Sequence, residues 1–177
     1  MRRQIRRLSR HLPFLAALVL LTGCGLTQSV KNGTGSAARA IFLPKVETLH
    51  LQLAARSALN TDEAQMPSPV EVRLWPLRSA AAFSQAGYSA LLKQDTQVLA
   101  NDLSGTPVTV RALPGNTTAV DIPLADDVQA VAIAAFFLYP DMQQDSWRLI
   151  LPRSSMDADR PSVIELNDRK LGIREQE

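Results

Sequence analysis

The chain has 177 residues, with 19 basic and 17 acidic side chains and a formal net charge of +2. Five arginines lie within the first ten residues and no acidic residue precedes Glu47, so the chain without residues 1–23 has a net charge of −3. It then has no excess of positive charge with which to bind nucleic acid, and its single cysteine, Cys24, excludes an intramolecular disulfide.

Residues 1–23 have the pattern of a secretory signal peptide, in which a basic start is followed by the apolar stretch Leu12–Leu21. At about 1.5 Å per residue, such a stretch covers about half of a ~30 Å hydrocarbon core. It is therefore too short for a lasting membrane-spanning helix, and we expect it to serve export only.

The residues Leu21-Thr22-Gly23-Cys24 resemble the bacterial lipobox. In lipoproteins the thiolate of this cysteine takes a diacylglyceryl group, and cleavage before it leaves an acylated N-terminus. Gly25 follows, in place of the aspartate that resembles an inner-membrane retention signal. The resemblance implies lipid attachment at Cys24 and a place on the outer membrane, facing the periplasm. The alternative is a chance cysteine behind an ordinary signal, or a buried structural one.

Residues 24–40 are predicted to form a lipidated, flexible tether. Gly25–Ala40 is rich in Gly, Ser, Thr, Asn and Ala and has no apolar periodicity. A chain of this length and kind has an r.m.s. span of roughly 22 Å, so a folded domain can stand clear of the lipid headgroups. Residues 41–177 have the length of a single domain.

Beyond the tether, apolar residues mostly alternate with polar ones, which is the pattern of β-strands. The alternation runs through Leu49–Leu53 and through Val70–Trp75, where Pro76 ends the second strand. Residues 107–123 contain two further alternating stretches around Pro114-Gly115, a pair that fits a type II turn. These residues are predicted to form a hairpin.

The nearly continuous apolar run Val128–Tyr139 is predicted to be a central strand covered on both faces, although a buried helix has the same pattern. Further strands are predicted at Trp147–Leu151 and Val163–Leu166. Only Ser79–Lys93 has helical spacing, with Ser79 as its cap and Gly87 as a weak point that favours a division into two turns. Seven to eight strands with a helical insertion after the second predict a mainly all-β sandwich.

The residue types of most catalytic and metal sites are missing. Beyond residue 23 the chain has one histidine, His50, and one cysteine, so a Cys/His nucleophile pair or a histidine-based metal site is nearly excluded. His50 falls on the polar face of a predicted strand, where a solvated or hydrogen-bonded role is expected. The sequence has no nucleophile-elbow or phosphate-loop motif. We predict no catalytic residue, no cofactor and no metal site, and do not expect an enzyme.

Paired carboxylates remain as candidates for acid–base chemistry or calcium binding. Each pair lies in a predicted turn, where acidic residues are common because they stay solvated, so we expect solvated loop acids. Trp75 and Trp147 are expected in the core or on a sheet face rather than on a ligand platform. The pairs are Asp62 with Glu63, Asp126 with Asp127, Asp141 with Asp145, and Asp157 with Asp159.

The connection between the first two predicted strands is unusually long. Loops between adjacent strands usually have about two to five residues, whereas this one has about twelve. Leu59 and Met66 are apolar residues near its ends, and Pro67 and Pro69 stiffen its exit. These features fit equally a loop held out for a partner and a loop folded over a sheet edge with both apolar residues buried. The candidate partner-binding residues are Ser57, Ala58, Leu59, Asn60, Thr61, Asp62, Glu63, Ala64, Gln65, Met66, Pro67 and Ser68.

The stretch Arg56–Leu77 is similar to the signature of the type VI secretion lipoproteins, the TssJ/VasD/SciN-like family. The insertion Ser79–Lys93 also resembles the helical segment of that family. Gln65 and Met66 depart from the family, which often has glycine and arginine there. The residues that carry the resemblance are Leu59-Asn60, Asp62, Pro67-Ser68-Pro69-Val70, Val72-Arg73, Trp75 and Leu77.

The resemblance implies an outer-membrane lipoprotein with a transthyretin-like sandwich and an added helical piece. It implies that Ser57–Ser68 contacts the periplasmic domain of a TssM/IcmF-like inner-membrane subunit, while acyl chains on Cys24 hold the outer membrane. One alternative is a periplasm-facing binding module for a small ligand or glycan, which needs a concave pocket with converging polar groups. Another is a hydrolase that uses one of the carboxylate pairs.

Overall fold

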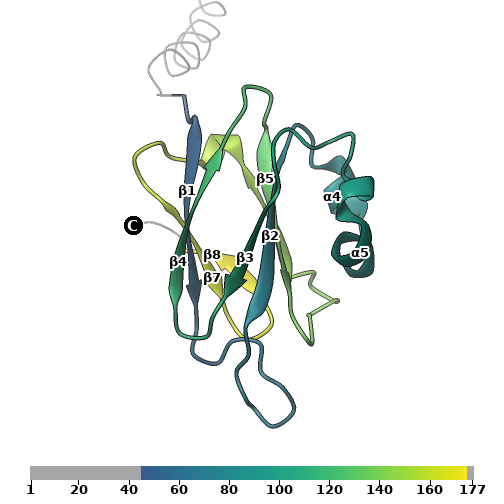
Figure 1. Cartoon of the computed structure of the whole chain (residues 1–177), viewed down its shortest axis with the longest axis vertical. Helices are drawn as coiled ribbons and strands as arrows, with labels where there is room; N and C mark the ends of the chain where they lie inside the picture. The colour runs from purple at the N-terminus through teal and green to yellow at the C-terminus, as the bar shows by residue number, and fades with distance from the viewer. Residues whose placement is uncertain (1–44, 175–177) are drawn as a thin grey trace, which may run out of the picture. The chain divides into compact units, whose positions relative to one another are not determined.

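A computed structural model describes residues 45–174 of the chain (Figure 1). The predicted signal peptide, Cys24 and the predicted tether lie outside the described residues. Within residues 45–174, two four-stranded sheets pack face to face, and a pair of short helices lies beside one of them (Figure 1). None of the helices in this range is long and apolar enough to cross a membrane.

The strand orders of the two sheets are β4-β1-β7-β8 and β3-β2-β5-β6. Neighbouring strands are antiparallel except β1 and β7, which are parallel. This confirms the predicted sandwich of seven to eight strands with a helical insertion after the second. The strands are β1 (Thr48–Ala55), β2 (Val70–Leu77), β3 (Val108–Ala112), β4 (Thr117–Pro123), β5 (Ala130–Phe136), β6 (Arg148–Pro152), β7 (Ser162–Leu166) and β8 (Leu171–Ile173). The helices are α4 (Ala81–Gln85), α5 (Tyr88–Val98) and the 3₁₀ helix η2 (Arg153–Ser155).

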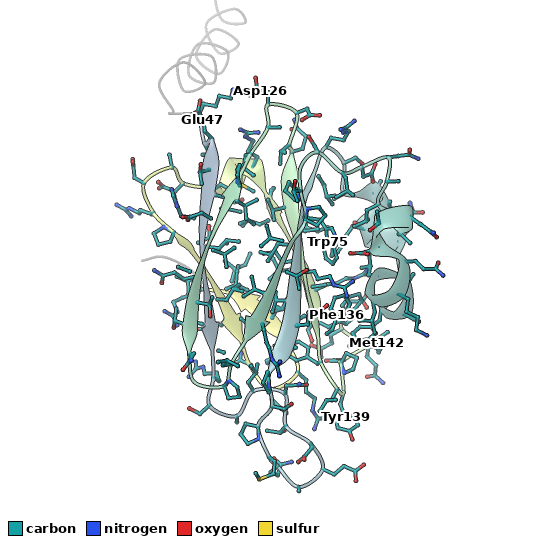
Figure 2. All side chains as sticks on the ribbon, viewed as in Figure 1. Glu47, Trp75, Asp126, Phe136, Tyr139 and Met142 are labelled. Atoms are coloured by element: carbon teal, nitrogen blue, oxygen red, sulfur yellow. The ribbon has the colours of Figure 1, made fainter. Side chains whose placement is uncertain are left out.

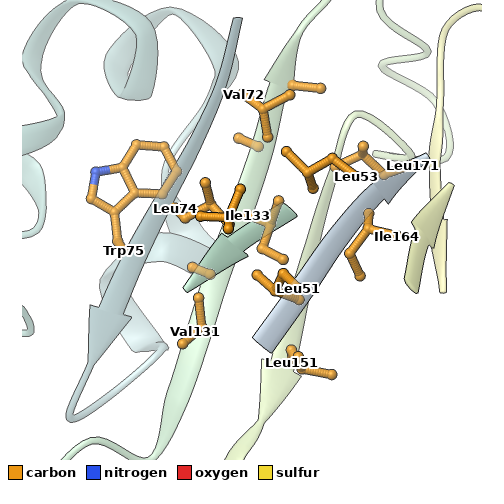
Figure 3. Packing of buried hydrophobic residues seen from close by; sticks show 14 of the residues in the cluster. Leu51, Leu53, Val72, Leu74, Trp75, Val131, Ile133, Leu151, Ile164 and Leu171 are labelled. Carbon is orange, nitrogen blue, oxygen red and sulfur yellow. The ribbon is translucent and has the colours of Figure 1, made fainter. Parts of the chain in front are cut away.

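The apolar faces of the two sheets meet in a core between them (Figure 3). Leu49, Leu51 and Leu53 of β1 are at most 1% exposed, and the residues that alternate with them are only half-buried. Val72 and Leu74 of β2 face them from the other sheet and are fully buried. Each such side chain contributes roughly 1.5–3 kcal/mol on burial, so the alternation fixes which face of each strand turns inward.

The second sheet is covered on its outer face as well. In β5, six of the seven residues are buried, which confirms the predicted central strand and excludes the helical alternative. Because successive side chains of a strand point to opposite faces, Val131 and Ile133 fill the core, while the alanines that alternate with them leave room for the helices. Trp75 of β2 pairs with Ala132 of β5 and lies on the helix side of the sheet (Figure 3). Its ring centroid is 5.7 Å from that of Phe83 in α4.

The predicted helix over Ser79–Lys93 is in fact the two helices α4 and α5, and the second continues beyond the predicted end. They are separated at Gly87, as the sequence favoured. The predicted cap at Ser79 is wrong, because the N-cap residue of α4 is Ala80. The Ser79 hydroxyl still accepts a hydrogen bond from the Ala81 N–H at 3.2 Å, so it satisfies one donor of the first turn from the position before the N-cap.

The predicted hairpin over residues 107–123 is wrong, although its turn is correct. Gly115 has a φ of +75°, and the Asn116 N–H donates to the Leu113 carbonyl at 3.1 Å, as expected in a type II turn. The strand before the turn, β3, pairs with β2, whereas the strand after it, β4, pairs with β1. Tight hairpins use type I′ or II′ turns, because type II splays the flanking strands. The Pro-Gly turn therefore directs the chain from one sheet to the other.

Gly115→Ala is expected to lower the free energy of unfolding by about 1–2 kcal/mol, because an alanine at this positive φ is strained. The added Cβ would lie 3.5 Å from the Ser57 hydroxyl oxygen, an ordinary contact, so the backbone rather than a collision causes the loss. Gly172→Ala is the matched control, since nothing lies within 4 Å of its added Cβ. Its expected change is within about 0.5 kcal/mol. Urea unfolding measures both, and equal losses would contradict the argument.

Candidate docking surface

Asn60 anchors the base of the predicted partner loop. It is 4% exposed and follows the fully buried Leu59. Its side-chain amide donates to the Ser68 hydroxyl at 2.9 Å and to the Pro69 carbonyl at 3.0 Å, and its Oδ1 accepts the Leu138 N–H at 2.7 Å. Its φ is +49°, a conformation that asparagine tolerates better than most residues. One side chain thus joins both arms of the loop to the segment that follows β5.

A second anchor joins Thr61 to the turn between β7 and β8. The Thr61 N–H and hydroxyl both donate to Asp168 Oδ1, at 2.9 and 2.7 Å. Burial raises the pKa of Asp168, but the hydrogen bonds from Thr61 and the nearby Arg169 guanidinium outweigh it, so the pKa lies below its ordinary value. The ionised carboxylate therefore stabilises the base of the loop at neutral pH.

Asp168→Asn is expected to lower the free energy of unfolding by about 1 kcal/mol at neutral pH, because a charged acceptor in a partly exposed site is lost. A carboxylate whose pKa is depressed by folding stabilises the protein above its unfolded pKa, and this is lost as the pH falls through the folded pKa. The difference from wild type should therefore shrink below about pH 4. Urea unfolding at several pH values measures it, with the exposed Asp159→Asn as control. A pH-independent difference would contradict the prediction.

The tip of the loop, residues 62–66, is a closed turn that projects from the sandwich (Figure 1). Asp62 Oδ1 accepts the N–H groups of Ala64 and Met66, both at 2.9 Å, and the Asp62 N–H donates to the Met66 carbonyl at 3.2 Å. The Met66 side chain is 62% exposed. The loop thus combines the two sequence interpretations: its base is folded into the core at Leu59, whereas its tip is held out in solvent.

The loop lies at the end of the sandwich opposite to the one at which the described chain begins (Figure 1). The chain enters β1 at Thr48 and leaves it at Ala55, just before the loop. A strand of that length spans roughly 27 Å. Glu47 lies at the first end, while Tyr139 and Met142 lie at the loop end (Figure 2). The entry of the chain into the domain and the loop tip are therefore separated by the length of the sandwich.

Two segments that the sequence did not connect with the loop lie beside it. Residues 137–147 connect β5 to β6, and residues 167–170 connect β7 to β8. Besides the hydrogen bonds to Leu138 and Asp168, the Tyr139 hydroxyl lies at hydrogen-bond distance, 3.5 Å, from a Glu63 carboxylate oxygen. The three segments form one continuous surface, which we call the docking surface.

Large exposed apolar side chains gather on the docking surface. They are Met66 at 62%, Leu138 at 57%, Met142 at 54% and Tyr139 at 45% exposure. Leu138 and Tyr139 directly follow the last fully buried residue of the β5 region, Phe137. The signal in the sequence was an apolar run that continues past the length of a typical strand. Apolar side chains held in water at one end of a domain are typical of a protein contact.

The other carboxylate pairs serve local structure. Asp141 and Asp157 accept hydrogen bonds from backbone N–H groups two and three residues further on. Asp126 pairs with Lys45, and Asp127 accepts a hydrogen bond from a nearby serine hydroxyl. No group of three or more His, Cys, Asp or Glu side chains that could hold a metal ion occurs in residues 45–174. These acids each bond to donors close to them in space rather than converging on a site.

The remaining candidates from the sequence also have structural partners. His50 Nδ1 lies 2.7 Å from Asp121 Oδ1, across the pairing of β1 with β4. Trp75 and Trp147 are fully buried, which confirms their predicted place in the core, and Trp147 donates to Asp145 at 3.2 Å. The space between the sheets is filled by side chains.

Comparisons with known proteins place this architecture in a recognised group. Residues 47–173 match the model of a family described as type VI secretion lipoprotein, VasD, EvfM, TssJ. A chain of a solved type VI membrane complex is 37% identical, with a TM-score of 0.70, over 73% of this chain and 99% of that one. A chain in a structure described as the T6SS protein TssM C-terminal domain from EAEC is 35% identical, with a TM-score of 0.66, over 73% and 98%. The T6SS lipoprotein TssJ1 from Pseudomonas aeruginosa is 26% identical, with a TM-score of 0.62, over 74% and 96%. A search of curated protein sequences gives no significant match.

Proposed function

Because the chain belongs to the family of type VI secretion lipoproteins, we propose that it tethers the periplasmic domain of a TssM/IcmF-like inner-membrane subunit to the outer membrane. The membership confirms the resemblance noted in the sequence. It makes the protein a structural lipoprotein component of the type VI secretion membrane complex. The attachment to the outer membrane and the contact with the partner are the two parts of the role that we propose.

The observation that carries the proposal is the separation of the two ends of the sandwich. The chain enters the described domain at one end, while the projecting tip and its exposed apolar neighbours lie at the other (Figures 1 and 2). A domain held from its N-terminal end can therefore present the docking surface away from its anchor. A protein that bridges two membranes needs contacts at opposite ends.

The anchor is acyl chains on Cys24. Each buried methylene contributes about 0.8 kcal/mol, and the two or three chains of a lipoprotein hold far more firmly than one. The flexible segment Gly25–Ala40 gives the domain reach without detaching it. Confinement near the membrane raises the effective concentration of the domain for its partner, so a modest interface suffices.

The partner contact is the loop Ser57–Ser68. Its support is that the tip is closed and projecting, and that a similar chain occurs in a structure described as a TssM C-terminal domain. Glu63 is exposed at the tip, whereas the Asp62 carboxylate is occupied by the backbone N–H groups of the turn. We therefore assign the contact chemistry of the tip to Glu63, Gln65 and Met66.

Cys24→Ser is expected to release the protein from membranes into the soluble periplasmic fraction and to reduce type VI secretion to the level of a strain lacking the gene. The physical reason is loss of the acyl chains, since serine cannot form the thioether. Membrane fractionation and a secretion assay measure the two effects, and detergent co-purification of the wild-type lipoprotein identifies what accompanies it. Ser29→Ala, in the predicted tether, is the control. Normal secretion by the Cys24 variant would reject the tether.

A further inference from the structure

A surface hollow of about 520 Å³ lies between residues 137–147 and residues 167–170. Tyr139 and Met142 line it from the first segment, and Lys170 lines it from the second. Both segments are joined to the loop 57–68 by hydrogen bonds. The hollow is therefore continuous with the proposed contact loop.

Most charged groups around the hollow are already used within the protein. The Asp168 carboxylate accepts from the loop and from Arg169, and the Asp141 carboxylate accepts from two backbone N–H groups. One charged group is left over. The Lys170 ammonium is exposed and forms no ion pair with another residue in the part of the chain that the structure describes. The Ser146 hydroxyl oxygen is buried and has no hydrogen-bond partner among the described residues.

The rest of the hollow is lined by exposed apolar side chains. Tyr139 is 45% and Met142 is 54% exposed, and the Arg169 guanidinium lies 5.9 Å from the centroid of the Tyr139 ring. Covering exposed apolar area on binding is favourable. An unpaired ammonium beside such area selects a ligand that combines an apolar group with a negative charge.

We infer that this hollow binds a second segment of the same periplasmic partner, one that carries an apolar side chain next to a carboxylate. The apolar side chain packs between Tyr139 and Met142, and the carboxylate pairs with Lys170. The inference rests on the proposed function, because the occupant belongs to that partner.

A protein segment fits the hollow better than a glycan does. The exposed apolar side chains extend beyond the hollow to Leu138 and to Met66 at the loop tip. A single protein partner can cover all of them together, whereas a sugar would cover only the hollow. The central apolar contacts and the charged rim of such a surface are the usual anatomy of a protein interface.

The test measures binding of the full-length lipoprotein, purified in detergent, to the purified periplasmic domain of the TssM/IcmF-like subunit. Lys170→Glu is expected to raise the dissociation constant at least tenfold, and Met142→Ser about three- to tenfold, whereas Lys170→Arg binds like wild type. Lys93→Glu, on the exposed side of α5, is the matched control and is expected to stay within twofold. Thermal unfolding confirms that each variant is folded.

The outcomes separate this inference from the proposed function. If the Lys170 and Met142 variants bind like wild type while a loop-tip variant does not, the hollow is not a partner site and the tether stands. If the wild type itself does not bind, both are overturned. A benzophenone amino acid at position 142 is expected to cross-link to a partner segment with Asp or Glu within a few residues. Cross-links only to glycan, or to a segment without acids, would overturn the inference.

Discussion

Asn60→Ala is expected to lower the free energy of unfolding by about 2–4 kcal/mol and to weaken partner binding in the molecules that remain folded. The alanine removes the acceptor of the Leu138 N–H and the donor to Ser68 and Pro69. Each unsatisfied buried group costs roughly 1–3 kcal/mol. Alanine also tolerates the +49° φ of this position less well than asparagine, by roughly 1 kcal/mol.

Two further variants separate the causes of that loss. Asn60→Gly removes the side-chain hydrogen bonds but accepts the positive φ, and Asn60→Asp keeps an oxygen for the Leu138 N–H but loses the donor. We expect both to be more stable than Asn60→Ala in urea unfolding. Asn101→Ala, an exposed asparagine in a turn, is the control and should change stability by less than about 0.5 kcal/mol. An Asn60→Ala variant as stable as wild type would refute the assigned role.

The strands were the most predictable part of the molecule, because alternation reports burial directly. Leu49, Leu51 and Leu53 are inward-facing as their spacing predicts. The apolar run that became β5 was harder, since burial on both faces erases the alternation. The alanines of β5 are a signal that was not used, because small residues on the outer face of a strand allow helices such as α4 and α5 to pack there.

The pairing of the strands was less predictable than their existence. A Pro-Gly turn between two alternating stretches suggested a hairpin, yet the two strands belong to different sheets. Turn chemistry is local, whereas the choice of sheet depends on partners far away in sequence. The type of the turn already argued against a tight hairpin.

The candidate site was found in part. The sequence pointed to Ser57–Ser68 through its length, its prolines and its family resemblance. It did not reveal that Asn60 and Thr61 bond to residues 137–147 and 167–170, because such contacts join positions far apart in the chain. Nor did it distinguish the Asp62 carboxylate, which closes the turn, from that of Glu63, which is exposed.

The contact role of the loop requires a variant that alters the tip alone. Leu59, Asn60 and Thr61 are buried, so removing the whole loop would damage the fold together with any contact. Exchanging Glu63 for serine, Gln65 for glycine and Met66 for serine removes the exposed tip side chains. It keeps the Asp62 carboxylate and its backbone hydrogen bonds. Glycine also suits the +61° φ at position 65.

This triple variant is expected to lose at least a hundredfold in affinity for the periplasmic partner and to unfold within about 0.5 kcal/mol of wild type. The affinity falls because Met66 supplies apolar contact area and Glu63 supplies charge, while stability is kept because neither side chain is buried. Titration calorimetry and urea unfolding measure the two quantities.

The matched control exchanges three exposed α5 residues, Ser89, Lys93 and Gln97, for alanine and is expected to bind like wild type. The pair of variants also tests how the surface is divided. One outcome is that the tip variant loses only part of the affinity and Lys170→Glu removes the rest. The loop tip and the hollow then contribute separately to binding, because effects at sites without shared partners add. If the tip variant binds and supports secretion like wild type, the loop is not the contact, and the proposed partner role fails even though the fold and the family remain.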